Sequence, residues 1–176
     1  MGRTPVDGSH GPTEHFGWME FCAGQEARYG YLCAHPELWA APVRVCEVAE
    51  VIRELVGKPV RVTSGLRMPS GSPTSQHEVG QALDIQVGGM TPRQLLRVIR
   101  TAAEQGALPH RLRQVIAESL HGTAADLDQP MGKGSGRWVH VAVEGVDGER
   151  WSTGARLPWA LSWDPPTAQR VYVAAT

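Results

Sequence analysis

The chain has 176 residues, a formal net charge of -1 and a sequence pI near 6.6. This length suits one domain with its own hydrophobic core, and the near-neutral charge argues against nucleic acid or an anionic membrane surface as a partner. No apolar run approaches the roughly 18 residues of a membrane helix, so we expect no membrane insertion.

The first predicted elements follow a segment without apolar periodicity. Residues 1–15 are rich in Gly, Pro and His and predict a flexible tail. Apolar residues recur at spacings of three and four from Pro42 to Val56, which indicates an amphipathic helix that ends at Gly57. Alternation of Val with charged residues over Pro59–Thr63 then predicts a short strand that breaks at Ser64-Gly65.

A second strand and a second helix are expected next. Residues Ala82–Val87 read as a strand. Thr91 offers an N-cap hydroxyl, Pro92 suits the first helical position, and Gly106 ends the helix that they begin.

Two further strands are predicted over Gln114–Ala117 and Trp138–Val143, separated by a long loop at 123–136. The resulting order predicts a small α+β domain over residues 16–176, with a mostly antiparallel sheet flanked by helices. Its Trp- and Pro-rich extension from about residue 145 has no repeat and is expected to pack across the domain. The three cysteines, an odd number without Cys-x-x-Cys spacing, are interpreted as packing residues.

Candidate chemistry concentrates in the segment SQHEVGQALD, residues 75–84. If His77 ends a loop and Asp84 lies on the following strand, Gly80 lets the backbone turn so that both side chains face one ion. His140 interrupts the last predicted strand and could supply a third ligand from the face that carries Trp138. Two imidazoles and one carboxylate leave a fourth tetrahedral position open for water, as in catalytic zinc sites. Taken singly, a strand histidine is more often satisfied or exposed, and an aspartate after a loop more often caps a turn.

The same decamer matches the Ser-x-His-x-x-Gly-x-Ala-x-Asp signature of the zinc D-alanyl-D-alanine carboxypeptidases, and the chain resembles that family. The family includes peptidoglycan endopeptidases and phage endolysins, and a related metal site occurs in hedgehog signalling domains. Trp138-Val139-His140 resembles its third-ligand motif, Ser64-Gly65-Leu66-Arg67 its Ser-Gly-x-Arg, and Trp18-x-Glu20-Phe21 its opening helix. The resemblance spans Phe16 to Val143 and implies this fold, with one zinc ion per chain held by His77, Asp84 and His140.

The resemblance also implies roles around the metal. Arg67 would contact the scissile carbonyl or the substrate carboxylate, where a guanidinium stabilises developing negative charge; the alternative is a surface salt bridge. Ser75 and Gln76 are candidates for substrate binding, for support of the ligands or for loop capping. Trp138 either lines the substrate groove or belongs to the core.

The general base departs from the family pattern. Many members carry Glu or Asp three residues before the last histidine, where this chain has Arg137, which cannot accept a proton. Gln114–Glu118 resembles a Gln-Leu-Ile-x-Glu strand of a phage-associated branch, so we predict Glu118 as the base. The alternatives are that Glu118 is a solvated acid at a strand end, or that Glu144 or Glu78 serves instead.

The function predicted from these features is hydrolysis of peptide bonds in peptidoglycan stem peptides, or in small peptides with D-amino acids, by metal-activated water. Neither carboxypeptidase nor endopeptidase specificity is indicated, and oligomeric state has no signature. The N-terminus lacks the apolar centre of a secretory signal, so we expect synthesis in the cytoplasm with phage-style release to the cell wall. Two alternatives are a zinc-binding domain that has lost its base and a metal-dependent amide hydrolase acting on a small peptide outside the cell wall.

Overall fold

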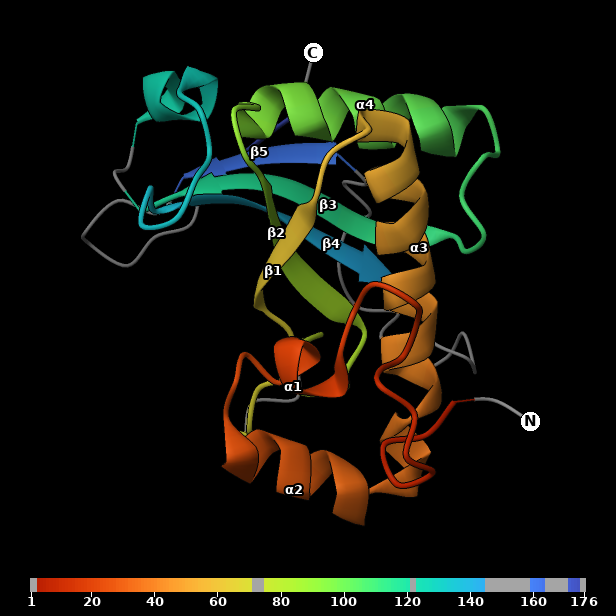
Figure 1. Ribbon diagram of the computed structural model, residues 1–176. Helices are drawn as coiled ribbons and strands as arrows, with labels where there is room; N and C mark the ends of the chain where they lie inside the picture. The colour runs from red at the N-terminus through yellow and green to blue at the C-terminus, as the bar shows by residue number, and fades with distance from the viewer. Residues whose placement is uncertain (1–2, 71–74, 121–122, 145–158, 164–170, 175–176) are drawn as a thin grey trace.

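The structure is a computed structural model that describes residues 3–70, 75–120, 123–144, 159–163 and 171–174 (Figure 1). Its strands form one sheet in the order β1-β2-β4-β3-β5-β6. Every neighbouring pair is antiparallel except β3 and β5, which are parallel. The strand bounds are Val60–Ser64 (β1), Ala82–Val87 (β2), Leu112–Ser119 (β3), Arg137–Val143 (β4), Trp159–Trp163 (β5) and Val171–Ala174 (β6). The predicted α+β class with a mostly antiparallel sheet is confirmed.

Two long helices cover the sheet, and shorter ones precede them. In Figure 1, α3 runs beside β1 and β2, α4 lies near the opposite end of the molecule from α1 and α2, and both long helices contact sheet strands. None of the described helices is long and apolar enough to cross a membrane. The helix bounds are Trp18–Phe21 (α1), Glu26–Ala34 (α2), Ala40–Val56 (α3) and Pro92–Glu104 (α4), with 3-10 turns at Pro36–Leu38 (η1) and Ala124–Asp128 (η2).

Local sequence explains the ends of the long helices. The Thr91 hydroxyl accepts the backbone N–H of Gln94, whose side chain accepts the Thr91 N–H, so a capping box begins α4 as predicted. Helix α3 ends at Gly57, whose φ of 60° is the left-handed conformation that glycine adopts without a Cβ clash. Helix α3 starts at Ala40, two residues before the predicted start.

Alternation along the strands separates a core face of the sheet from a polar face. Core-facing residues of β1 to β4 pack with residues of α3 and α4 in one hydrophobic cluster, while polar residues at the intervening positions point to the opposite face. Burying this apolar surface drives the packing of helices on the sheet. The core-facing strand residues are Val60, Val62, Leu83, Ile85, Val87, Val115, Ala117, Val139, Val141 and Val143.

The N-terminal segment differs from the predicted tail. Residues 3–15 contain no helix or strand, as expected, but they make specific contacts with the folded domain. Thr13 Oγ1 and the His15 backbone N–H both donate to the Glu50 carboxylate on α3, at 2.7 and 2.8 Å. Tyr29 Oη donates to the carbonyl of Pro5 at 2.8 Å. A polar segment without periodicity can still be ordered when residues of the folded domain satisfy its hydrogen bonds.

The C-terminal extension adds strands to the sheet. The backbone of β5 pairs in parallel with β3, and β6 pairs with β5, so both described parts lie at one end of the sheet. Residues 145–158, where the extension was predicted to begin, lie outside the described residues. The three cysteines are free, with Cys22 and Cys46 buried and Cys33 half-buried, in agreement with a packing role.

Candidate metal centre

Three side chains meet on the polar face of the sheet. Asp84 on β2 lies directly opposite His140 on β4, and His77 comes from the turn at residues 76–80 that precedes β2. One ligand atom from each lies within 4.8 Å of the others, so the group could hold a metal ion. All three are buried, with 4% of His77, 4% of Asp84 and 8% of His140 exposed.

The separations of the ligand atoms match a zinc site. His77 Nε2 lies 3.2 Å from both His140 Nδ1 and Asp84 Oδ1, and His140 Nδ1 lies 3.0 Å from Asp84 Oδ1. Zinc–ligand bonds of about 2.0–2.1 Å at tetrahedral angles separate neighbouring ligand atoms by about 3.3 Å. The three atoms therefore approximate one face of a tetrahedron, and the fourth corner is left for a further ligand.

Each of the three residues also has a second polar atom that contacts a group outside the cluster. His77 Nδ1 lies 2.6 Å from the Gly65 carbonyl, which fits an N–H donor at Nδ1 and leaves the Nε2 lone pair facing the cluster. His140 Nε2 lies 3.2 Å from Gln76 Oε1. Arg67 donates to Asp84 Oδ2 at 2.9 Å, so Asp84 presents its other oxygen to the imidazoles.

The protonation states also suit a divalent cation. Burial lowers the pKa of His77 below its usual value. Asp84 acts to raise that pKa, whereas the charges of His140 and Arg67 act to lower it. Burial alone would raise the pKa of Asp84, but its contacts with His140 and His77 outweigh burial and hold that pKa below its usual range. At neutral pH the site therefore offers a neutral His77 and an ionised Asp84, the forms that bind metal.

Two glycines shape the backbone around the ligands. Gly80 has φ +71°, a left-handed conformation that glycine adopts easily, in agreement with the turn predicted between His77 and Asp84. A Cβ on Gly65 would lie 2.1 Å from the carbonyl oxygen of Phe21 in α1. Only glycine allows this close approach, which places the Gly65 carbonyl against His77.

Arg67 lies beside the cluster of His77, Asp84 and His140. Besides its bond to Asp84, its Nε donates to Ser64 Oγ at 3.2 Å, and 42% of its side chain is exposed. The guanidinium therefore lies between the cluster and solvent. Arg67 does form a salt bridge, the alternative considered from the sequence, and its partner is Asp84 of the cluster; its contact with a substrate stays a prediction.

Glu118 shares the polar face with His140. Glu118 on β3 is paired with Trp138 on β4, two residues from His140, so all three side chains leave the same face. Such a diagonal neighbour lies about 7–8 Å away between Cα atoms, within reach of a glutamate side chain. The Glu118 carboxylate accepts the indole N–H of Trp138, and Glu118 is 9% exposed. The alternative of a solvated strand-end acid does not fit this burial.

Arg137, at the position of the family's usual acid, has the opposite orientation. It alternates with Trp138 along β4 and pairs with Asp126 of η2 at 3.4 Å. The other two acids considered as bases are also engaged elsewhere. Glu78 accepts from the Ser70 hydroxyl at 2.6 Å, and Glu144 lies 3.7 Å from Arg111.

The two polar residues before His77 differ in their contacts. The Ser75 carbonyl accepts the Glu78 N–H at 3.1 Å and so helps to close the turn. The Gln76 side chain instead contacts His140, which lies 64 residues away in the chain. The sequence indicated that Gln76 could support one of the ligands, but it did not indicate which one. The contact with His140 depends on the pairing of β2 with β4.

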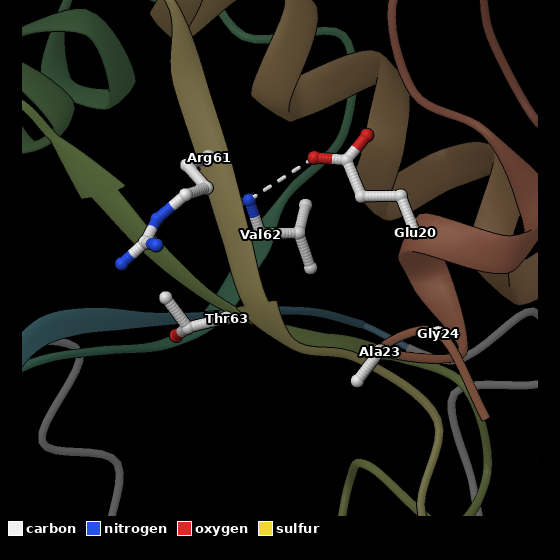
Figure 2. Close-up of a pocket in the computed structure, with 6 residues that line it drawn as sticks. All are labelled: Glu20, Ala23, Gly24, Arg61, Val62 and Thr63. Carbon is white, nitrogen blue, oxygen red and sulfur yellow. Dashed lines mark hydrogen bonds between the residues drawn. The ribbon is translucent and has the colours of Figure 1, made fainter. Parts of the chain in front are cut away.

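A surface hollow lies along the free edge of β1 and next to α1 (Figure 2), and its lining does not include His77, Asp84 or His140. Glu20 accepts the Val62 N–H there at 3.3 Å, so a carboxylate covers part of the unpaired strand edge. The residues that line it are Glu20, Ala23, Gly24, Arg61, Val62 and Thr63.

Comparison with protein families agrees with this geometry. The family model described as Peptidase M15 matches residues 15–121, which include His77, Asp84, Arg67 and Glu118. No curated protein and no solved structure matches the chain. His140 lies beyond the matched range and reaches the cluster because β4 pairs with β2. Since the match covers more than half of the 176 residues, the chain belongs to the peptidase M15 family of zinc metallopeptidases.

Proposed function

We propose that this protein is a zinc peptidase that hydrolyses peptide bonds in peptidoglycan stem peptides. The observation that carries the proposal is the buried cluster of His77, Asp84 and His140, whose separations and protonation states suit zinc. Membership of the peptidase M15 family supports a metallopeptidase. The choice of peptidoglycan rests on the resemblance of residues 75–84 to the signature of D-alanyl-D-alanine carboxypeptidases.

The cluster and Arg67 would act on the substrate carbonyl. Zinc, when bound, acidifies water and polarises a carbonyl. His77, Asp84 and His140 would hold the ion with one coordination position open. Arg67 is half-exposed next to Asp84, so its guanidinium can donate to the scissile carbonyl or to a substrate carboxylate and stabilise negative charge there.

Glu118 would move the proton. Its carboxylate lies on the same face as His140, and the Trp138 indole N–H holds it in place. A carboxylate at this position would take a proton from the attacking water and deliver it to the leaving amine. Trp138 would therefore orient the base, in addition to the predicted contact with substrate.

The test combines metal content with digestion of purified peptidoglycan, with products identified by mass. We expect one zinc per chain in the wild type and in Glu118→Gln, stem-peptide fragments from the wild type, and a rate about 100-fold or more lower in the variant. The exposed Glu104 of α4 offers a matched control, and Glu104→Gln should keep the wild-type rate. Protein without zinc would overturn the metal site, and an undiminished rate in Glu118→Gln would overturn the role of Glu118.

A second candidate function is a zinc-binding domain without catalysis. It is favoured by Arg137, which stands at the usual base position and pairs with Asp126. This candidate would be supported if the wild type binds zinc but releases no peptidoglycan fragments. A screen of small amides containing D-amino acids could still reveal turnover. In that case the enzyme is an amide hydrolase acting outside the cell wall.

A further inference from the structure

The ring of His140 has two different polar environments. Its Nδ1 faces Asp84 Oδ1 at 3.0 Å and His77 Nε2 at 3.2 Å, whereas its Nε2 faces Gln76 Oε1 at 3.2 Å. A neutral imidazole carries one N–H and one lone pair, and its neighbours decide which nitrogen carries each. Only a lone pair on Nδ1 can serve a metal held between the three residues.

Without Gln76, the surroundings would favour the wrong arrangement. Asp84 Oδ1 is a hydrogen-bond acceptor 3.0 Å from His140 Nδ1, so it attracts an N–H on that nitrogen, and a proton there removes the lone pair from the cluster. The Gln76 oxygen offers an acceptor on the other side of the ring, which favours the N–H on Nε2. It also opposes rotation of the ring, which would replace Nδ1 by carbon.

We propose that Gln76 is a positioning residue that orients His140 for metal binding through Nδ1. This inference rests on the proposed zinc site and extends it to a residue outside the ligand set. His77 is oriented by a backbone acceptor, the Gly65 carbonyl, whereas His140 is oriented by a side chain. The support of His140 can therefore be removed by substitution without changing the backbone.

The backbone of Gln76 is itself fixed. The Gln81 N–H donates to the Gln76 carbonyl at 2.9 Å, across the turn that presents His77. One turn thus supplies both a ligand and the support of a second ligand. Replacing a residue that hydrogen-bonds to a metal ligand typically lowers metal affinity about 10–100-fold, so the contribution of Gln76 is measurable.

The test compares three variants by zinc affinity, measured in competition with a chelator. Gln76→Met keeps a similar side-chain length without an acceptor and should bind zinc about 10–100-fold more weakly. Gln76→Glu keeps an acceptor and should bind zinc as tightly as the wild type or more tightly. Gln81→Met is the control, because it makes the same chemical change in the same segment. The carboxamide oxygen of Gln81 is buried and has no hydrogen-bond partner among the described residues, so this variant should bind zinc as tightly as the wild type.

Ring spectra of 15N-labelled His140 give a second readout that a purely structural role would not change. The zinc-free wild type should show a protonated Nε2, and Gln76→Met should shift the population towards a protonated Nδ1. Thermal unfolding of the zinc-free variants checks that each one folds. Wild-type affinity together with an unchanged ring spectrum in Gln76→Met would overturn the positioning role alone. Absence of zinc binding by the wild type would instead overturn the proposed function and the ligand role of His140 with it.

Discussion

Replacing His140 by alanine should abolish most of the stability that zinc gives to the fold. A ligand that binds only the folded state stabilises it by RT ln(1 + [L]/Kd), which is about 2.7 kcal/mol at a free concentration of 100 Kd. For a domain of this length, each kcal/mol raises Tm by about 2–4 °C, so zinc should raise the wild-type Tm by about 5–11 °C.

The variant retains two of the three clustered ligands. If its affinity falls about 100-fold, the same free zinc gives RT ln 2, about 0.4 kcal/mol, and a rise of about 1–2 °C. The zinc-free variant also loses the hydrogen bond from His140 Nε2 to Gln76 Oε1, which costs about 0.5–1.5 kcal/mol. The informative quantity is therefore the change in Tm that zinc causes in each protein, and not Tm itself.

The assay is thermal unfolding followed by circular dichroism, with and without buffered free zinc. His10 is exposed and outside the cluster, so His10→Ala is the control that should keep the full zinc-induced rise. An equal rise in His140→Ala and the wild type would refute the argument that β4 supplies a ligand.

Three further predictions concern the rest of the fold. Gly65→Ala would force a Cβ to within 2.1 Å of a backbone oxygen in α1, so we expect about 1–3 kcal/mol of destabilisation in denaturant unfolding; Gly88→Ala, where a Cβ meets nothing within 4 Å, should be close to neutral. Burial opposes the ionisation of Glu50, but hydrogen bonds from Thr13 and His15 outweigh it and hold its pKa below 4.5. The unfolded state therefore binds the proton more readily, so the stability that Glu50 contributes is present above its unfolded-state pKa and is lost as pH falls through its lower folded-state pKa. Unfolding titrations of the wild type and Glu50→Gln should converge in acid, and a constant difference would contradict this linkage. Burial raises the pKa of the Cys22 thiol to about 12 and that of Cys46 well above its usual value, so a thiol reagent at pH 8 should consume at most one equivalent in the native protein and three after unfolding.

The clustering of His77, Asp84 and His140 was predictable because each residue lies in a pattern that local rules interpret. A glycine between His77 and Asp84 indicates a turn, and strand alternation places Asp84 and His140 on defined faces. The same alternation, once β3 and β4 are paired, places Glu118 on the polar face and Arg137 on the other. Which strands pair with each other could not be predicted from the sequence, because strand pairing depends on the packing of the whole sheet.

Contacts between distant segments were the least predictable. The irregular residues near the N-terminus looked like a tail, since hydrogen bonds to a distant helix leave no periodic signal. The same reason applies to the contact of Gln76 with His140 and to the parallel pairing of β5 with β3.

The sequence by itself determined helices α3 and α4, strands β1 to β4, the class of fold and the residue types of the His77, Asp84 and His140 cluster, because helix caps, strand alternation and motif spacing act over a few neighbouring residues. Only the tertiary structure decided which nitrogen of each histidine faces the cluster, that Arg67 binds Asp84, and that Gln76 supports His140. Those relations depend on distances of about 3 Å between segments far apart in the chain, which only the packing of the sheet and its turns determines.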